Sequence, residues 1–254
     1  YAIDHSPTRL ALAAAAVKNA LRLGPNRGEA HLARARHLYH GNLDYDGARA
    51  ELAIARQTLP SDSRVFELAG YVDRRQGHQE EGLRNLLRAL ELDPRNVGLL
   101  QQISGSYQNL RQYSEMTAVL DQALGIDPND MDTRVSRASV NLHWQADPRP
   151  LHSTIESILA EDPEAGETIA DDWFDLALCE RDPDAAQRTL SALGERGFGK
   201  DAVIFSRKFG EGLVARMRGD VAAAQTAFLA ARTQQQELVR AQGDYAPALC
   251  ALGL

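Results

Sequence analysis

The run nearest to a catalytic motif is Gly-Glu-Arg-Gly-Phe-Gly-Lys-Asp, from Gly194 to Asp201. Its glycine and lysine spacing matches a phosphate-binding P-loop, whose backbone amides and lysine hold nucleotide phosphates. Asp201 stands where Ser or Thr should hold magnesium, and its carboxylate would repel the phosphates. Residues 185–193 before it have the pattern of a helix, whereas a P-loop follows a strand. We therefore interpret the run as a glycine-rich turn and expect no cofactor.

Three histidines form the nearest approach to a metal site. His37 and His40 lie three residues apart on a predicted helix, and His31 lies six residues before His37. Two imidazoles on one helix face can begin a zinc site, but no Cys, Asp or Glu at ligand spacing completes one locally. We expect these residues to belong to a polar surface and to bind no metal.

Acidic residues gather on another predicted helix, at Asp171, Asp172, Asp175 and Glu180. Such a cluster could serve acid–base chemistry or bind calcium. Carboxylates in the first turn of a helix are also stabilised by its dipole, and this is the interpretation we favour. No Ser-His-Asp or Cys-His arrangement stands out, so the sequence predicts a protein that is not an enzyme.

Composition narrows the range of partners. The 254 residues are 44% hydrophobic and 25% charged, as in ordinary globular proteins, and carry a net charge of -7. This acidic balance disfavours nucleic acid as a ligand, because phosphate binding needs a basic field. The longest apolar run, 11–17, is far shorter than the roughly 20 residues that span a bilayer, so we expect no membrane insertion. Cys179 and Cys250 are expected to be buried thiols. Neither these cysteines nor any motif in the sequence indicates the cellular compartment of the protein.

Prolines mark the elements that would position any site. They fall at positions 25, 60, 94, 128 and 163, at intervals of 35, 34, 34 and 35 residues, and each closes a segment rich in Leu and Ala. A near-constant period of this size is typical of stacked repeat proteins. Such solenoids join neighbouring repeats through one elongated core and present a long surface for binding.

The unit from Arg64 to Asn96 shows what one repeat contains. Leucines at 83, 86, 87 and 90 fall on one face of a helix that ends at Asp93-Pro94. A second periodic segment, 65–75, precedes it across the turn Gln76-Gly77-His78. One repeat is therefore predicted to be a helical hairpin.

At this level the pattern resembles the tetratricopeptide repeat, a helix-turn-helix of about 34 residues. The repeat that ends at Pro94 has the large and small residues of that motif in order, and the repeats before and after it fit as well. The matching residues in the clearest repeat are Phe66, Gly70, Gly82, Leu86, Ala89 and Pro94. The later repeats match more loosely, through Trp173, Ala186, Gly212 and Phe228 among others.

The resemblance implies an all-α fold, a right-handed superhelical solenoid of antiparallel helix pairs. We expect one such domain over 1–254, with about six repeats and a half-repeat at each end. The expected repeats are 28–60, 61–94, 95–128, 129–163, 164–198 and 200–243, and the half-repeats are 1–25 and 245–254. Because the chain begins at Tyr1 and solenoids normally end in capping repeats, we expect either a piece excised from a longer protein or ends that stack on another molecule.

In proteins of this kind, residues of the first helices line the concave face and bind partners. The residues of this chain at those positions are His37, His40, Arg64, Glu67, Tyr71, Arg74, Gln101, Gln108 and His143. The basic clamp with which some family members hold chaperone tails is absent: the corresponding positions include Ala33, Leu68 and Gly98. The wider sequence style is similar to bacterial tetratricopeptide regions attached to signalling modules.

The leading functional prediction is a non-catalytic scaffold that binds a protein or peptide on its concave face. The alternative is a structural subunit that associates head to tail through the two half-repeats, as a homo-oligomer. In that case Val17, Leu21, Leu249 and Leu252 would make the end-to-end contacts.

Overall fold

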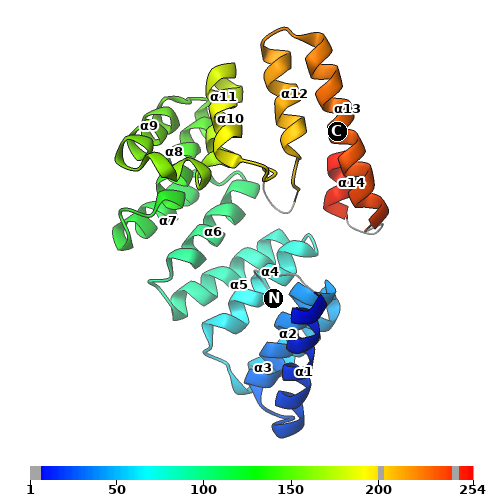
Figure 1. Cartoon of the computed structure of the whole chain (residues 1–254). Coiled ribbons are helices and arrows are strands. Elements are labelled where there is room, and N and C mark those ends of the chain that lie inside the picture. The colour runs from blue at the N-terminus through cyan, green and yellow to red at the C-terminus, as the bar shows by residue number, and fades with distance from the viewer. Residues whose placement is uncertain (1–6, 200–202, 242–245, 254) are drawn as a thin grey trace. The chain divides into compact units, whose positions relative to one another are not determined.

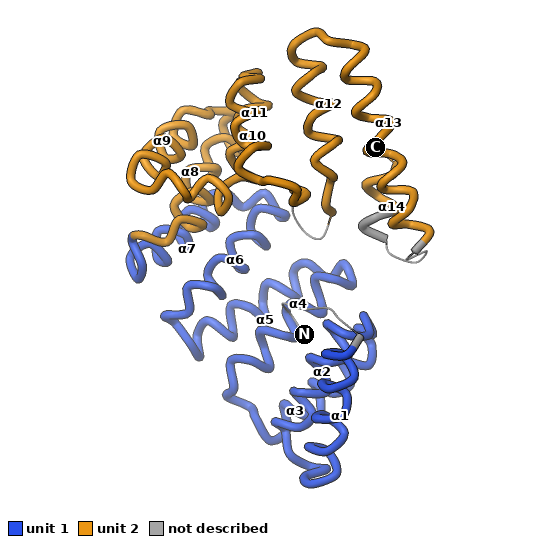
Figure 2. The backbone as a smooth tube through the Cα atoms, viewed as in Figure 1, with its two compact units in different colours: residues 1–128 blue, residues 129–254 orange. Residues whose placement is uncertain are grey.

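The computed structural model of the chain describes residues 7–199, 203–241 and 246–253. Those residues form helices joined by short turns, and they contain no β-strand (Figure 1). The all-α prediction is confirmed. Backbone contacts divide the chain into two compact units, residues 1–128 and 129–254 (Figure 2). The division falls at the predicted boundary between the repeats 95–128 and 129–163.

Unit 1 consists of a leading helix and three helix pairs. The leading helix is α1 (Pro7–Leu23), and the pairs match the predicted repeats 28–60, 61–94 and 95–128. They are α2 (Gly28–His37) with α3 (Tyr45–Thr58), α4 (Ser63–Arg75) with α5 (Gln79–Leu92), and α6 (Val97–Asn109) with α7 (Tyr113–Ile126). In the first pair, a π-helical turn, η1 (Leu38–Asn42), extends α2. It ends at Leu43, which has the left-handed αL conformation.

Unit 2 contains the remaining described helices. Its elements are α8 (Met131–Gln145), α9 (Arg149–Glu161), the 3₁₀ turn η2 (Pro163–Glu167), α10 (Ala170–Glu180), α11 (Pro183–Leu193), α12 (Arg207–Met217), α13 (Val221–Ala241) and α14 (Ala246–Leu252). The helices pack in sequence as α8 with α9, α10 with α11, and α12 with α13. Between α11 and α12, Phe198 and Phe205 form an isolated antiparallel bridge.

The prolines set the ends of the second helices. Four of these helices, α3, α5, α7 and α9, end two residues before Pro60, Pro94, Pro128 and Pro163. The residue before each proline has left the helical region, as at Asp93 with φ -139° and ψ 73°. This is the steric effect of a proline ring on its predecessor. Asp62, Asn96 and Asp130 then cap the next helix by accepting a hydrogen bond from its backbone.

Small buried residues bring the paired helices together. Ala35, Ala48 and Ala55 are fully buried between α2 and α3. Gly70 of α4 faces Gly82 of α5 so closely that a Cβ on either residue would lie 2.9 Å from the carbonyl oxygen of the other. These positions are the small-residue positions of the repeat motif.

The two cysteines differ from the sequence expectation. Cys179 and Cys250 are both exposed, so the prediction of buried thiols was wrong. Cys179 lies on the outer side of α10, next to Glu180. Within the described residues, no helix is long and apolar enough to cross a membrane.

Replacing Gly70 with Ala should destabilise unit 1. The new methyl group would lie 2.6 Å from Leu86 and 2.9 Å from the Gly82 carbonyl oxygen. Overpacking of this kind costs about 2 kcal/mol, more than the roughly 1 kcal/mol that Ala gains over Gly in a helix. Urea unfolding followed by circular dichroism measures the change.

Gly105→Ala is the matched control on α6. A Cβ at Gly105 meets nothing within 4 Å, so this variant should gain about 0.5–1 kcal/mol. Equal changes in the two variants would contradict the close approach of α4 and α5.

Candidate functional site

A row of polar and aromatic side chains crosses the first helices of unit 1. It contains Tyr39 in η1, Glu67, Tyr71 and Arg74 on α4, and Gln102 on α6, and we call it the tyrosine–arginine face. The rings of Tyr39 and Tyr71 lie with centroids 6.4 Å apart. His40 extends the row, because its ring meets that of Tyr39 edge to face at 4.7 Å. The face thus joins consecutive helix pairs through side chains.

Tyr71 lies at the centre of this face and is held in one orientation. Its hydroxyl donates to Glu67 Oε1 at 2.7 Å, one helical turn earlier. Burial raises the pKa of the Tyr71 hydroxyl well above its ordinary value, and the hydrogen bond to Glu67 and the charge of Glu67 raise it further. Tyr71 therefore remains a neutral donor over the physiological pH range.

Arg74 connects Tyr71 to the next helix pair. Its guanidinium lies 5.3 Å from the centroid of the Tyr71 ring, within the range of a cation–π contact. It also donates to Gln102 Oε1 at 2.8 Å and to the Gln102 carbonyl oxygen at 3.2 Å. One side chain thus links α4 to α6.

A buried carboxylate supports the face from within the repeat. Asp73, only 9% exposed, accepts hydrogen bonds from Arg49 of α3 and from Asn85 of α5, each at 2.8 Å. Arg49 also contacts His78 Nδ1 at 3.0 Å. Because a buried charge must be paired, this node fixes how α3, α4 and α5 pack and therefore where Tyr71 and Arg74 lie.

The structure brings together some of the predicted site residues and separates others. Glu67, Tyr71, Arg74 and His40 meet on the tyrosine–arginine face, whereas Arg64 is held at the start of α4 by Asp62, at 2.6 and 2.9 Å. The residue of α6 that meets Arg74 is Gln102, between the predicted Gln101 and Gln108. Tyr39 is not among the predicted site residues, although its spacing of 32 residues from Tyr71, close to the repeat period, could have indicated it. His143 is exposed on α8 in unit 2.

Of the histidines of the first repeat, His31 has hydrogen-bond partners, whereas the Nδ1 atom of His37 has none among the described residues. His31 is buried, and its ring nitrogens contact Glu51 Oε2 at 2.6 Å and the Pro25 carbonyl oxygen at 2.8 Å. His37 is half-buried, with its Nδ1 atom enclosed beside Gly41. No group of three or more His, Cys, Asp or Glu that could hold a metal occurs in the described part of the chain.

The P-loop-like run differs from a phosphate cradle wherever the structure describes it. A helix, α11, precedes it and ends at Gly194, which has a positive φ of 60°. The Gly199 amide, which would face a phosphate in a P-loop, donates to Asp171 Oδ1 at 2.9 Å. Asp171 and Asp172 occupy the first turn of α10, as expected for an acidic helix start. Lys200 and Asp201 lie outside the described residues.

Comparison with solved structures identifies the architecture. A tetratricopeptide repeat protein from Parabacteroides merdae matches with a TM-score of 0.71 at 13% identity, covering 93% of this chain and 88% of that one. The fold is that of tetratricopeptide repeat proteins. The described helix pairs and their small-residue contacts agree with this fold.

Other tetratricopeptide proteins of similar length also match. PilF from Pseudomonas aeruginosa has a TM-score of 0.60 at 17% identity, covering 87% of this chain and 95% of its own. YrrB, described as a tetratricopeptide protein with an unusual peptide-binding site, has a TM-score of 0.51 at 15% identity and covers 94% and 98%. No protein-family model matches the sequence, and no curated protein is similar to it.

The raised pKa of Tyr71 predicts how stability depends on pH. A group whose pKa is higher in the folded state contributes stability that is present below its ordinary pKa, about 10 for tyrosine, and lost as pH rises above that value. Unfolding free energy should therefore fall more steeply above about pH 10 in the wild type than in Tyr71→Phe.

A spectroscopic titration provides the independent check. Tyrosinate absorbance should rise equally in the wild type and in Tyr71→Phe up to about pH 11, because folded Tyr71 does not ionise there. The chain has seven tyrosines. If the variant lost one seventh of the absorbance rise, Tyr71 would be shown to titrate as an ordinary tyrosine.

Proposed function

We propose that this protein is a non-catalytic interaction scaffold whose tyrosine–arginine face in unit 1 binds an extended segment of a protein partner. The observation that carries the proposal is the row from Tyr39 through Tyr71 and Arg74 to Gln102. It presents aromatic rings, a cation and amide groups across consecutive first helices. In solenoids, repeated first helices form long binding surfaces of this kind.

The chemistry of the face suits a peptide better than a small substrate. Tyr39 and Tyr71 offer ring faces against which an apolar or proline side chain can pack. Arg74 offers charge-assisted donors that can exchange Gln102 for a peptide carbonyl or carboxylate, and Glu67 offers an acceptor. These groups are spread over several helices instead of converging on one reacting atom.

The absence of a convergent catalytic arrangement in the described residues agrees with a scaffold. Burial and Glu67 raise the pKa of the Tyr71 hydroxyl, so it stays protonated at neutral pH and supplies no tyrosinate base. The buried carboxylate of Asp73 is occupied by Arg49 and Asn85. Neither group is positioned to transfer a proton to a bound molecule.

A second candidate function is head-to-tail self-association. It is favoured by large apolar side chains that remain exposed on the first and last helices. On α1, Leu12 is 65% and Leu23 is 75% exposed, and on α14, Leu249 is 46% exposed. Among the predicted contacts, Val17 and Leu21 are half-buried in unit 1, and Leu252 is half-buried in unit 2.

Peptides selected from a displayed library against the protein test the scaffold proposal. The variant Tyr71→Ala/Arg74→Ala should bind a selected peptide at least about tenfold more weakly, because truncating central aromatic and arginine anchors removes most of the binding energy. Fluorescence anisotropy measures the affinity, and circular dichroism verifies that the variant is folded.

Arg84→Ala/Arg95→Ala is the matched control, because it removes two exposed arginines of unit 1 that lie outside the face. It should leave the affinity unchanged. Equal affinities for all three proteins would show that the tyrosine–arginine face is not the binding surface.

Sedimentation velocity over a range of concentrations tests self-association. If α1 forms the contact, the wild type should assemble with increasing concentration, and Leu12→Glu/Leu23→Glu should remain a monomer, because a charge on an apolar contact opposes burial. A wild type that stays monomeric at every concentration would rule this function out.

A further inference from the structure

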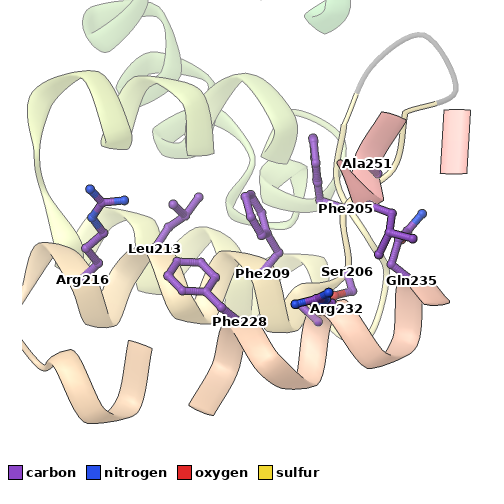
Figure 3. A pocket seen from close by; sticks show the side chains of 11 residues that line it. Phe205, Ser206, Phe209, Leu213, Arg216, Phe228, Arg232, Gln235 and Ala251 are labelled. Atoms are coloured by element: carbon purple, nitrogen blue, oxygen red, sulfur yellow. The ribbon is translucent and has the colours of Figure 1, made fainter. Parts of the chain in front are cut away.

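Unit 2 holds an apolar cavity that has no counterpart among the sequence predictions. It has a volume of about 420 Å³ and is lined by residues of α12, α13 and α14 and of the segment before α12 (Figure 3). A cavity of this size can bury a large side chain or a small ligand. The candidate end contact Leu252 forms part of its wall.

Phenylalanines form the main wall of the cavity. The rings of Phe205 and Phe209 stack with centroids 4.8 Å apart, and Phe209 meets Phe228 of α13 at 5.6 Å. Behind them, Phe198 continues the cluster to the fully buried Phe174. Phe205, Phe209 and Phe228 remain half-buried, so their free sides can accept an apolar group.

The cavity is positively charged although the whole chain carries a charge of -7. Arg216 and Arg232 line it, both are exposed, and neither makes an ion pair or hydrogen bond with a described residue. None of the described residues that line it is acidic. The nearest acid in the sequence of α12, Glu211, is paired with Arg207 and Lys208 at 3.0 and 2.7 Å.

Ser206 supplies a polar group that lacks a partner. It is the N-cap residue of α12 and one of the residues that line the cavity. Its side chain makes no capping bond, and its Oγ atom is buried without any hydrogen bond. A buried hydroxyl without a partner is unfavourable, and a bound acceptor would satisfy it. An anion there would also be stabilised by the amino end of the helix.

The helical hairpin sets the spacing of these groups. The contact between Phe209 and Phe228 fixes the antiparallel register of α12 and α13, which places Arg232 opposite Ser206. Arg216 lies ten residues after Ser206, about 15 Å along the helix at 1.5 Å per residue. The phenylalanines lie between these two polar ends (Figure 3).

We propose that this cavity binds an extended acidic segment of a partner protein, in which two acidic residues flank a large apolar side chain. Alternate residues of an extended chain point the same way, and residues four apart lie about 13 Å from each other. Acidic side chains at the ends of a five-residue segment can therefore reach the Ser206–Arg232 end and Arg216, with the central side chain on the phenylalanines. Arginine suits this role because it pairs with carboxylates bidentately.

Charge argues against a second copy of the chain as the occupant through α1. That helix contains Arg9, Lys18 and Arg22 and no acidic residue. It would bring three further cations to the two free arginines of the cavity. The proposed site is separate from the tyrosine–arginine face, so each can fail without the other.

The test uses a fluorescein-labelled pentapeptide, Glu-Ser-Phe-Ser-Glu, and its neutral analogue with Gln at both ends. Fluorescence anisotropy should show that Arg216→Gln/Arg232→Gln binds the acidic peptide at least about tenfold more weakly than the wild type. The neutral analogue should bind both proteins equally weakly. The matched control is Arg188→Gln/Arg240→Gln, which makes the same change of charge at exposed arginines of unit 2 outside the cavity, and it should retain the affinity.

Ser206→Ala separates a binding role from a structural one. Removing the buried hydroxyl without a partner should raise the thermal midpoint, while the affinity for the acidic peptide should fall about fivefold. A lower midpoint with unchanged affinity would show that Ser206 serves only the fold, and would overturn its part in the site.

Four results would overturn the proposal. The first is equal affinity of the wild type and the cavity variant, and the second is an equal loss in the Arg188→Gln/Arg240→Gln control. The third is a different occupant: tighter binding of decanoate than of the peptide would indicate a small amphipathic acid. Self-association in sedimentation velocity that is lost only in the cavity variant would indicate a second copy.

Discussion

The close approach of paired helices at small buried residues is the constraint on which the fold depends. Gly70 and Gly82 bring the backbones of α4 and α5 into van der Waals contact, and Ala35, Ala48 and Ala55 do the same between α2 and α3. Helices at this distance leave no room for large side chains along the seam, so the large apolar residues pack at its sides. The outward positions of the first helices are then free to carry polar and aromatic groups.

Buried polar side chains with several hydrogen-bond partners fix the relative positions of the packed helices more closely. Apolar contacts are non-directional, so they tolerate small shifts of one helix along another. The hydrogen bonds of the Asp73 carboxylate allow smaller helix shifts, because Arg49 and Asn85 must both reach it at 2.8 Å. His31 acts similarly between α2 and α3 through Glu51. On the tyrosine–arginine face, Arg74 directly follows Asp73 in α4 and Tyr71 lies two residues before it, so the placement of both side chains follows from this node.

The sequence predicted features that act locally. Proline excludes the helical conformation from its predecessor, so the ends of α3, α5, α7 and α9 could be placed from Pro60, Pro94, Pro128 and Pro163. Glu67, Tyr71 and Arg74 share a helix face at spacings of three and four residues, so their proximity was also predictable. Gln102 was missed because choosing it over Gln101 requires the rotation of α6 about its axis. That rotation depends on packing between repeats, and it cannot be predicted from the spacing of residues along one helix.

The cavity of unit 2 was missed for a different physical reason. Phe205 precedes α12 and Phe228 lies on α13, and in a sequence both resemble core residues of a repeat. The Phe205 ring packs against Phe198, and the Phe228 ring packs against Phe209, as core residues should. Gly212 admits the Phe228 ring so closely that a Cβ there would lie 2.5 Å from it. This contact depends on how α12 packs against α13, which the pattern of either helix alone does not show.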